Sequence, residues 1–454
     1  MRGAPPEPCA RHQGACGPAG KAMSPVEGIG AKRRGPYFRP TRDLFKARSP
    51  KDTMTMIKSA GIPDMPLEFE WVHIAYDDSS SFVETYGFAG NQGAVNLEGV
   101  RIRPRDLPSD TLLIFMHPAS TLQLLPVPRA AAAMGAHVLC AGSRYARNDS
   151  AAILEKVLLD LGAYIRHAKA VWGYRKVVLT GWSGGGSLSL FYQSQAENPT
   201  ITHTPAGDPV NIVGAGLIPA DAVIFQAAHI SRARLLLDII DPSVRDESDP
   251  DGRDPMLDIY NPANPNQPPY SSGFLLGYRE AQIARMHRIT AWVKETLATL
   301  KARNTGEVER GFVTHRTLAD PRFLDGTIDP NDRRTGWCYL GNPETVNSGP
   351  VGLARFSTLR AWLSQWSIED SNADGLLCAG RMTAPLLVIE NTADDAVPRT
   401  HPLSIFDAAG SADKRFERIE GATHYYMGQP ELLDQASNLI LDWLEDRKLF
   451  ERPF

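Results

Sequence analysis

Residues 177–188 constrain the fold of this chain more than any other stretch. They open with the apolar run Val177-Val178-Leu179, pass through the pattern Gly-x-Ser-x-Gly, and continue as an apolar segment that suits a helix. So sharp a turn between strand and helix strains its central residue, Ser183, and requires small residues two positions before and after it. Gly181 and Gly185 satisfy this requirement. We therefore expect the Ser183 hydroxyl to project beyond a sheet edge, with the N-terminus of a helix behind it.

The rest of the chain alternates between apolar runs and helical patterns. Buried strands are expected at 111–117, 137–141, 222–227, 384–390 and 414–420. Apolar residues at helical spacing lie between and after these runs, ending at 134 and covering 151–171 and 431–446. Such alternation predicts a mostly parallel sheet with helices on both faces. Ahead of it, alternating segments at 67–75, 82–88 and 95–102 predict antiparallel strands.

The alternation stops over residues 231–375 and resumes afterwards. Within this stretch, helical spacing predicts a long helix over 274–300 and a shorter one over 359–366, while the Pro- and Asn-rich run 261–269 predicts a loop. The chain therefore divides into an extension (1–55), a first core part (56–230), a largely helical insertion late in the sheet (231–375) and a second core part (376–454).

Composition argues against several classes of protein. A net charge of −4 over 454 residues offers no general attraction for nucleic acid. We therefore expect no nucleic-acid partner. No apolar run reaches the roughly 18 residues of a membrane span, and no secretory signal is recognisable, so no membrane partner is expected either. The five cysteines are scattered and odd in number, which disfavours a disulfide framework or zinc cluster. A reducing, cytoplasmic location is the simplest interpretation.

The N-terminal extension has its own character. Residues 1–51 carry 11 Lys or Arg against three Asp or Glu, and Pro and Gly are frequent. This composition, without periodicity, predicts disorder. Two alternatives stay open: a basic arm for an anionic partner, and a protein that begins instead at Met23 or Met54.

A serine hydroxyl is a poor nucleophile at neutral pH unless a base and an orienting acid support it. The candidate base is His424, in a short loop between a strand and the last helix. The candidate acid is Asp394, in the turn after the strand at 384–390, and Asp395 is its nearest rival. Both loops follow strands of the parallel sheet, so both should reach the edge where Ser183 lies. The chemistry needs neither a metal nor an organic cofactor.

Negative charge that develops on a substrate oxygen must also be stabilised. The backbone N–H of Gly184 is the first candidate donor, because it follows Ser183 at the start of the helix. The second should come from the loop after the strand at 111–117. We expect Ala119 to supply it, because Pro118 has no N–H. His117 is expected to brace this loop.

These motifs, in the order Ser183, Asp394, His424, resemble the α/β-hydrolase superfamily over about residues 67–230 and 380–454. The resemblance implies an α/β-hydrolase fold, with residues 231–375 as a cap. Two positions depart from the family pattern. His117-Pro118 stands in place of the usual His-Gly, and Asn391 stands in place of the usual glycine at the start of the acid loop. Asparagine also tolerates the left-handed backbone conformation, so we expect that loop to keep its shape.

The resemblance implies a serine hydrolase that cleaves a carboxylic ester or lactone in a small molecule. Trp182, His117 and His229 are the candidate substrate-binding residues. The same three catalytic groups could instead cleave a thioester, amide or carbon–carbon bond, or transfer an acyl group. A non-catalytic ligand-binding protein with this fold is the alternative from another class. Substrate identity and oligomeric state are not readable from the sequence.

Overall fold

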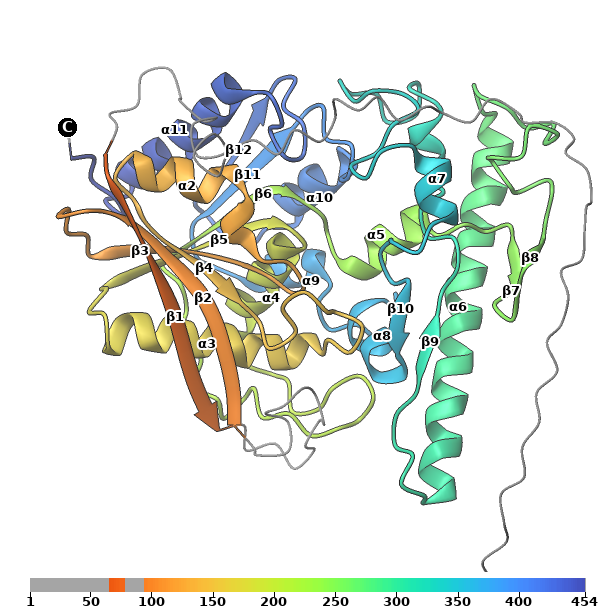
Figure 1. The fold of residues 1–454 in the computed structure, drawn as a ribbon, viewed down its shortest axis with the longest axis horizontal. Coiled ribbons are helices and arrows are strands. Elements are labelled where there is room, and N and C mark those ends of the chain that lie inside the picture. The colour runs from red at the N-terminus through yellow and green to blue at the C-terminus, as the bar shows by residue number, and fades with distance from the viewer. Residues whose placement is uncertain (1–64, 78–93, 454) are drawn as a thin grey trace, which may run out of the picture. The chain divides into compact units, whose positions relative to one another are not determined.

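The computed structural model describes residues 65–77 and 94–453, which fall in one compact unit, Ile57–Phe454. The predicted disordered extension and the predicted strand at 82–88 lie outside the described residues. Within them, eight strands form the central sheet in the order β1-β2-β4-β3-β5-β6-β11-β12 (Figure 1). The strands are β1 (Leu67–Asp77), β2 (Ala94–Pro104), β3 (Thr111–His117), β4 (His137–Gly142), β5 (Lys176–Ser183), β6 (Ala222–Ala228), β11 (Leu386–Asn391) and β12 (Lys414–Ile419).

The strand directions make the sheet mostly parallel. β2 pairs antiparallel with both β1 and β4, and every later pair, from β4 to β12, is parallel. With helices on both faces, this is the predicted α/β-hydrolase fold, and the expected antiparallel start is confirmed at β1 and β2. Each strand expected on either side of the insertion lies within two residues of its predicted bounds.

Period-two burial along the strands builds two apolar cores, one on each face. Alternate residues of β3 show this: Leu112 and Ile114 join one core, and Leu113 and Phe115 join the other. Helices α2 (Pro126–Ala133) and α11 (Pro430–Asp446) cover one face, and α3 (Leu154–Ala170), α4 (Gly184–Glu197), α9 (Gly375–Arg381) and α10 (Thr400–Ala408) cover the other (Figure 1). A short 3-10 helix, η2 (Leu122–Leu124), precedes α2.

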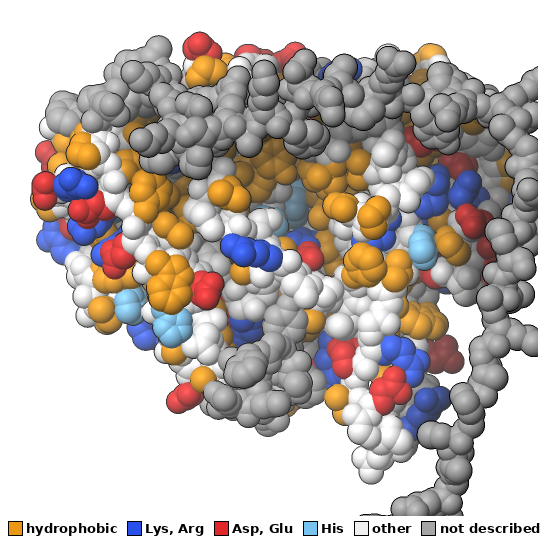
Figure 2. Space-filling model, in the orientation of Figure 1, with side chains coloured by type: hydrophobic (Ala, Val, Ile, Leu, Met, Phe, Trp, Pro, Cys, Tyr) orange, Lys and Arg blue, Asp and Glu red, His pale blue; other side chains and the backbone are white. Residues whose placement is uncertain are grey.

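The exposed edge strand β1 is protected by charge. Glu68 and Glu70 form ion pairs with Arg103 and Arg101 on β2. The ring of Trp71 on the same strand is exposed, and Figure 2 shows red and blue side chains beside apolar ones along this edge. Inter-strand charge of this kind disfavours pairing with another edge strand.

Glycines let α4 begin directly against the sheet. A Cβ on Gly185 would lie 2.3 Å from the carbonyl oxygen of Met116 at the end of β3. A Cβ on Gly181 would lie 2.4 Å from the carbonyl oxygen of Gly185, and one on Gly186 would lie 2.3 Å from Ala228 Cβ. Any larger residue must push the helix away from β3, β5 or β6. The glycine run therefore sets how closely the helix follows the strand.

Residues 232–365, between β6 and α9, carry a separate set of elements and an apolar core of their own, built around Met286, Val293 and Trp362. The elements are α5 (Arg232–Ile239), β7 (Val244–Asp246), β8 (Asp249–Arg253), α6 (Ser272–Arg303), β9 (Gly311–Val313), η3 (Pro321–Phe323), α7 (Pro343–Ser348), β10 (Phe356–Thr358) and α8 (Leu359–Gln365). The predicted long and short helices are confirmed as α6 and α8. The two small antiparallel ribbons, β7–β8 and β9–β10, were not predicted.

None of the helices within residues 65–77 and 94–453 combines the length and apolar character needed to cross a bilayer.

We predict that Gly185→Ala destabilises the protein, because the new methyl group would overlap a backbone carbonyl that cannot rotate away. Overpacking of this kind typically costs about 1–3 kcal/mol. The matched control is Gly277→Ala, in α6, where an added Cβ meets nothing within 4 Å. That substitution should leave stability unchanged or raise it by up to about 1 kcal/mol, since alanine favours helix. Urea denaturation of both variants checks the prediction, and equal stability would contradict it.

Candidate active site

Ser183 lies at the junction of β5 and α4 with a strained backbone. Its φ of 53° and ψ of −124° fall in a region that non-glycine residues rarely adopt, at a cost of about 1–3 kcal/mol. Pairing of β5 with β3 and β6 on its two sides holds the turn in place. The predicted sharp turn is confirmed. It leaves Ser183 partly exposed at the first turn of α4, where backbone N–H groups lack helical partners.

His424 and Asp394 form a buried pair. The imidazole Nδ1 lies 2.9 Å from Asp394 Oδ2, and the residues are 1% and 4% exposed. The other carboxylate oxygen, Oδ1, accepts hydrogen bonds of 2.8 Å from the backbone N–H groups of Ala396 and Val397. Both carboxylate oxygens are therefore engaged, and the carboxylate is held in one orientation. A carboxylate on Nδ1 places the remaining proton-accepting nitrogen, Nε2, away from the acid.

Trp182 connects this pair to the serine turn. Its indole Nε1 donates a 3.1 Å hydrogen bond to the carbonyl oxygen of His424, and the two rings lie 4.4 Å apart between centroids. Trp182 immediately precedes Ser183, so the histidine loop packs against the turn itself. The structure thus pairs the predicted base His424 with the predicted acid Asp394, and packs the histidine against the residue that precedes the predicted nucleophile Ser183.

Asp395, the rival acid, has a different environment. Its backbone carbonyl accepts a 3.1 Å hydrogen bond from Tyr339 N–H. Burial, followed by the negative charge of neighbouring Asp394, raises the pKa of the Asp395 carboxyl to about 6. His424 pairs with Asp394, which leaves Asp395 beside the pair and not within it.

A buried polar network joins the acid loop to the histidine loop. Asn391 Nδ2 donates to the carbonyl oxygen of Thr423 at 2.9 Å, and its Oδ1 accepts from the Tyr426 hydroxyl at 2.8 Å. The same hydroxyl accepts from Gln226 Nε2 at 2.8 Å. Asn391 ends β11 in parallel pairing with Ile419 and has no positive φ, so the expectation that it replaces a left-handed glycine is wrong. The hydrogen bonds of its side chain, and not a special backbone conformation, explain why asparagine stands at this position.

Gln429 holds the histidine loop from the other side. Its Oε1 accepts from the backbone N–H and the hydroxyl of Thr423, at 2.9 and 3.0 Å. Its Nε2 donates to the carbonyl oxygen of Gly421 at 2.7 Å. Neither Gln429 nor Tyr426 was predicted from the sequence. Polar residues within five positions of a candidate histidine are the only local signal that could have indicated them.

The loop after β3 differs from its prediction. His117 braces it as expected, because Nδ1 accepts hydrogen bonds from the backbone N–H groups of Ala119 and Ser120, at 3.1 and 3.0 Å. The Ala119 N–H is therefore directed at an imidazole, and its predicted role as an oxyanion donor is corrected. The imidazole also lies against the turn, since a Cβ on Gly184 would be 2.6 Å from His117 Nε2. Burial lowers the pKa of His117 to about 3, with smaller contributions from Arg232 and His424.

His229 directly follows β6 and is buried, with an Nδ1 that has no hydrogen-bond partner in the described structure. Burial lowers its pKa well below the ordinary value, and the nearby His401, Arg232, His117 and His424 lower it further. Arg232 pairs with Asp149 and lies 4.3 Å from the centroid of the Trp366 ring. The edge of the sheet thus carries a group of buried imidazoles and one buried guanidinium, of which Arg232 and His401 were not predicted.

The insertion reaches the same edge. The Tyr339 ring lies 6.3 Å from that of His424. Asp332 N–H donates to the carbonyl oxygen of Thr392 at 3.0 Å, and its carboxylate accepts from the Thr392 hydroxyl. Residues from the insertion therefore contact both loops that carry the candidate acid and base.

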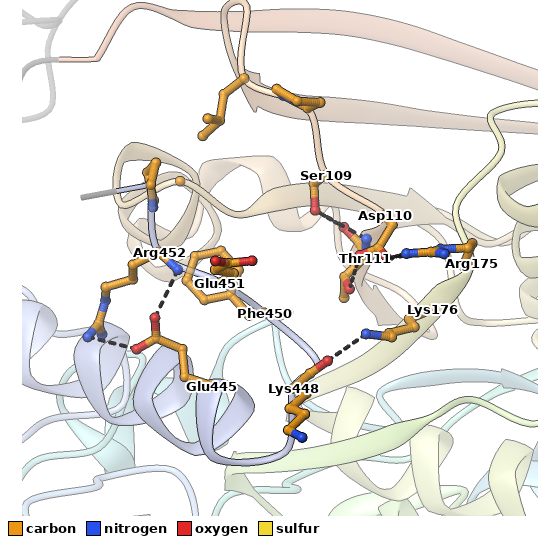
Figure 3. A pocket seen from close by; sticks show the side chains of 14 residues that line it. Ser109, Asp110, Thr111, Arg175, Lys176, Glu445, Lys448, Phe450, Glu451 and Arg452 are labelled. Carbon is orange, nitrogen blue, oxygen red and sulfur yellow. Dashed lines mark hydrogen bonds and ion pairs between the residues drawn. The ribbon is translucent and has the colours of Figure 1, made fainter.

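A cavity of about 830 Å³ lies at the opposite, amino-terminal ends of β3 and β5 (Figure 3). Several of its charged side chains are paired with neighbouring groups: Arg175 with Asp110, Arg452 with Glu445, and Lys176 with the carbonyl oxygen of Lys448. The contact between Lys176 and Lys448 ties the C-terminal segment to the sheet. The cavity is remote from Ser183, which lies at the carboxyl end of β5.

No protein-family model and no curated protein sequence matches this chain. Solved structures are similar to it at low identity. DcsB, solved in complex with its substrate analogue, is 10% identical with a TM-score of 0.45, over 83% of this chain and 99% of that one. The esterase domain of a Rhodothermus marinus protein is 12% identical with a TM-score of 0.40, over 83% and 98%. The monoacylglycerol lipase of Paleococcus ferrophilus is 14% identical with a TM-score of 0.40, over 77% and 98%.

We predict that Tyr426→Phe destabilises the protein, because it removes the hydroxyl that satisfies both Gln226 and Asn391. Leaving buried polar groups without partners costs about 1–3 kcal/mol. The neighbouring Tyr425→Phe is the control, since among the described residues the Tyr425 hydroxyl has no hydrogen-bond partner. Urea denaturation should show a loss for Tyr426→Phe only. Equal stability of the two variants would contradict the proposed network.

Proposed function

We propose that this chain, with its α/β-hydrolase fold, is a serine hydrolase that cleaves the ester bond of a small molecule. One observation carries the proposal: a strained serine lies between strand and helix, and a buried histidine–aspartate pair packs against its neighbour Trp182. Strain of this kind persists only where surrounding structure supports it, and it concentrates at functional sites.

The roles follow from the chemistry of each group. Ser183 Oγ attacks the ester carbonyl while His424 Nε2 takes its proton. Asp394 keeps the proton of His424 on Nδ1 and stabilises the imidazolium that forms. His424 then gives the proton to the leaving alkoxide oxygen, which departs as an alcohol and leaves an acyl group on Ser183. Water activated by His424 hydrolyses that acyl-enzyme and restores the serine.

Within the described residues, no hydrogen bond joins Ser183 Oγ to His424. Such bonds are often long before substrate binds and shorten in the reacting complex. The N–H of Gly184, in the first turn of α4, faces no helical acceptor and is suited to the negative oxygen of the tetrahedral intermediate.

The insertion is proposed to act as a cap that selects the substrate. The rings of Tyr339, Tyr425 and Trp182 lie 6.3, 4.9 and 4.4 Å from that of His424, between centroids. Aromatic rings around the base favour an apolar acyl or leaving group. The unpartnered Nδ1 of buried His229 is a further candidate for substrate contact.

Covalent labelling tests the proposed function. We expect a fluorophosphonate probe to label the wild-type protein, and Ser183→Ala to abolish both labelling and hydrolysis of a short p-nitrophenyl ester. A panel of ester, thioester and amide substrates then identifies the bond cleaved. Wild-type protein that neither labels nor hydrolyses any of them would favour a ligand-binding protein instead.

The two adjacent carboxylates provide a matched pair of variants. We predict that Asp394→Asn lowers kcat by about 10⁴-fold, because the amide donates to Nδ1 and holds the imidazole in the wrong tautomer. Asp395→Asn should change kcat by less than about tenfold, since Asp395 makes no hydrogen bond to His424 in the described structure. Steady-state kinetics on the same ester measure both. The reverse order would assign the acid to Asp395, and equal losses would contradict the assignment to Asp394 alone.

A further inference from the structure

We propose that the side chain of His117 supplies the second oxyanion hydrogen bond, through the Nε2–H of a neutral imidazole. This inference rests on the proposed serine hydrolase function. It replaces the backbone donor expected in the loop after β3 with a side-chain donor.

The first step is the position of the imidazole proton. Two backbone N–H groups, from Ala119 and Ser120, converge on His117 Nδ1 at 3.1 and 3.0 Å. A nitrogen that accepts from two donors carries no proton of its own. The proton of the neutral ring is therefore on Nε2.

The second step is the lack of another donor in this loop. Pro118 has no N–H, and the N–H groups of Ala119 and Ser120 are both directed at His117 Nδ1. Residues 118–120 thus leave no backbone N–H for a substrate oxygen. Without a side-chain donor, Gly184 alone would face the developing charge.

The third step is location. A Cβ on Gly184 would stand only 2.6 Å from His117 Nε2, so this nitrogen lies beside the residue whose N–H is the first donor. Among the described residues, nothing accepts a hydrogen bond from His117 Nε2. The absence of a side chain at Gly184 leaves the space that the imidazole occupies. The Gly184 N–H and the His117 Nε2–H therefore belong to neighbouring groups beside the Ser183 turn, and we infer that a substrate oxygen above Ser183 accepts from both.

The fourth step is charge. Burial lowers the pKa of His117 to about 3, so the ring stays neutral at physiological pH. A neutral donor avoids placing a second positive charge beside the imidazolium that His424 becomes. It also keeps Nδ1 free to hold the loop, which fixes the direction of Nε2–H before substrate binds. Donors fixed in advance at such a site contribute most to the rate.

Two substitutions separate the two roles of His117, hydrogen-bond donation by Nε2 to the substrate and hydrogen-bond acceptance by Nδ1 from the loop. Asparagine places its Oδ1 near the position of Nδ1 and can accept from Ala119 and Ser120, but has no donor near Nε2. Glutamine places its Nε2 donor near the imidazole Nε2 and loses the Nδ1 acceptor. The proposal predicts that His117→Asn lowers kcat by about 10²–10³-fold with KM within a few-fold of wild type. His117→Gln should keep a kcat at least about tenfold above that of His117→Asn.

The outcomes are distinguishable. A purely structural role for His117 predicts the opposite order, with the Asn variant close to wild type, and that result would overturn the inference. If the Asn variant does not fold, His117→Leu replaces it beside His117→Gln, and equal kcat for Gln and Leu overturns the inference. Active wild type with inactive Ser183→Ala shows that the proposed function stands whatever the His117 variants do. Wild type without activity or labelling removes both proposals together.

Discussion

The close contact between the first turn of α4 and the ends of β3 and β5 controls the rest of the site. Gly181 and Gly185 allow backbone atoms to meet where a Cβ would overlap a carbonyl oxygen. Because the helix cannot retreat, Ser183 must take its unfavourable backbone angles. The same contact leaves room at Gly184 for the imidazole of His117. The strained backbone of Ser183 and the close approach of His117 to Gly184 thus have a single cause, the contact between α4 and the strands.

Around this turn, buried polar groups are held by partners from distant parts of the chain. Asn391 and Gln429 attach the histidine loop to β11 and to the start of α11. Removal of either partner would leave a buried donor or acceptor without a hydrogen bond. The free-energy cost of that loss holds the loops in these positions. The imidazoles of His117 and His229 remain neutral because they are buried beside other potential cations. A site with this polarity is suited to stabilise negative charge that forms during a reaction.

Strands proved easier to predict than the insertion, for a physical reason. β3 and β6 are buried on both faces, so most of their residues are apolar and each run is evident in the sequence. Helix α6 repeats its apolar positions over many turns. The ribbons β7–β8 and β9–β10 have strands of only three to five residues, several of them exposed, and such short pieces carry no period. Helix α10 was also not predicted; it has a proline, Pro402, in its first turn.

The sequence alone determined the sharp turn at Ser183, the order of strands along the chain and the two loops that carry His424 and the acid. Each depends on residues close together in the chain, where glycine size and apolar period act locally. Only the tertiary structure decided that Asp394 and not Asp395 contacts His424, that Ala119 donates to His117, and that Asn391 ties two loops together. Those outcomes depend on where distant backbones end in space. The local sequence pattern does not distinguish Asp394 from Asp395, and it does not show which nitrogen of His117 accepts the hydrogen bond from Ala119.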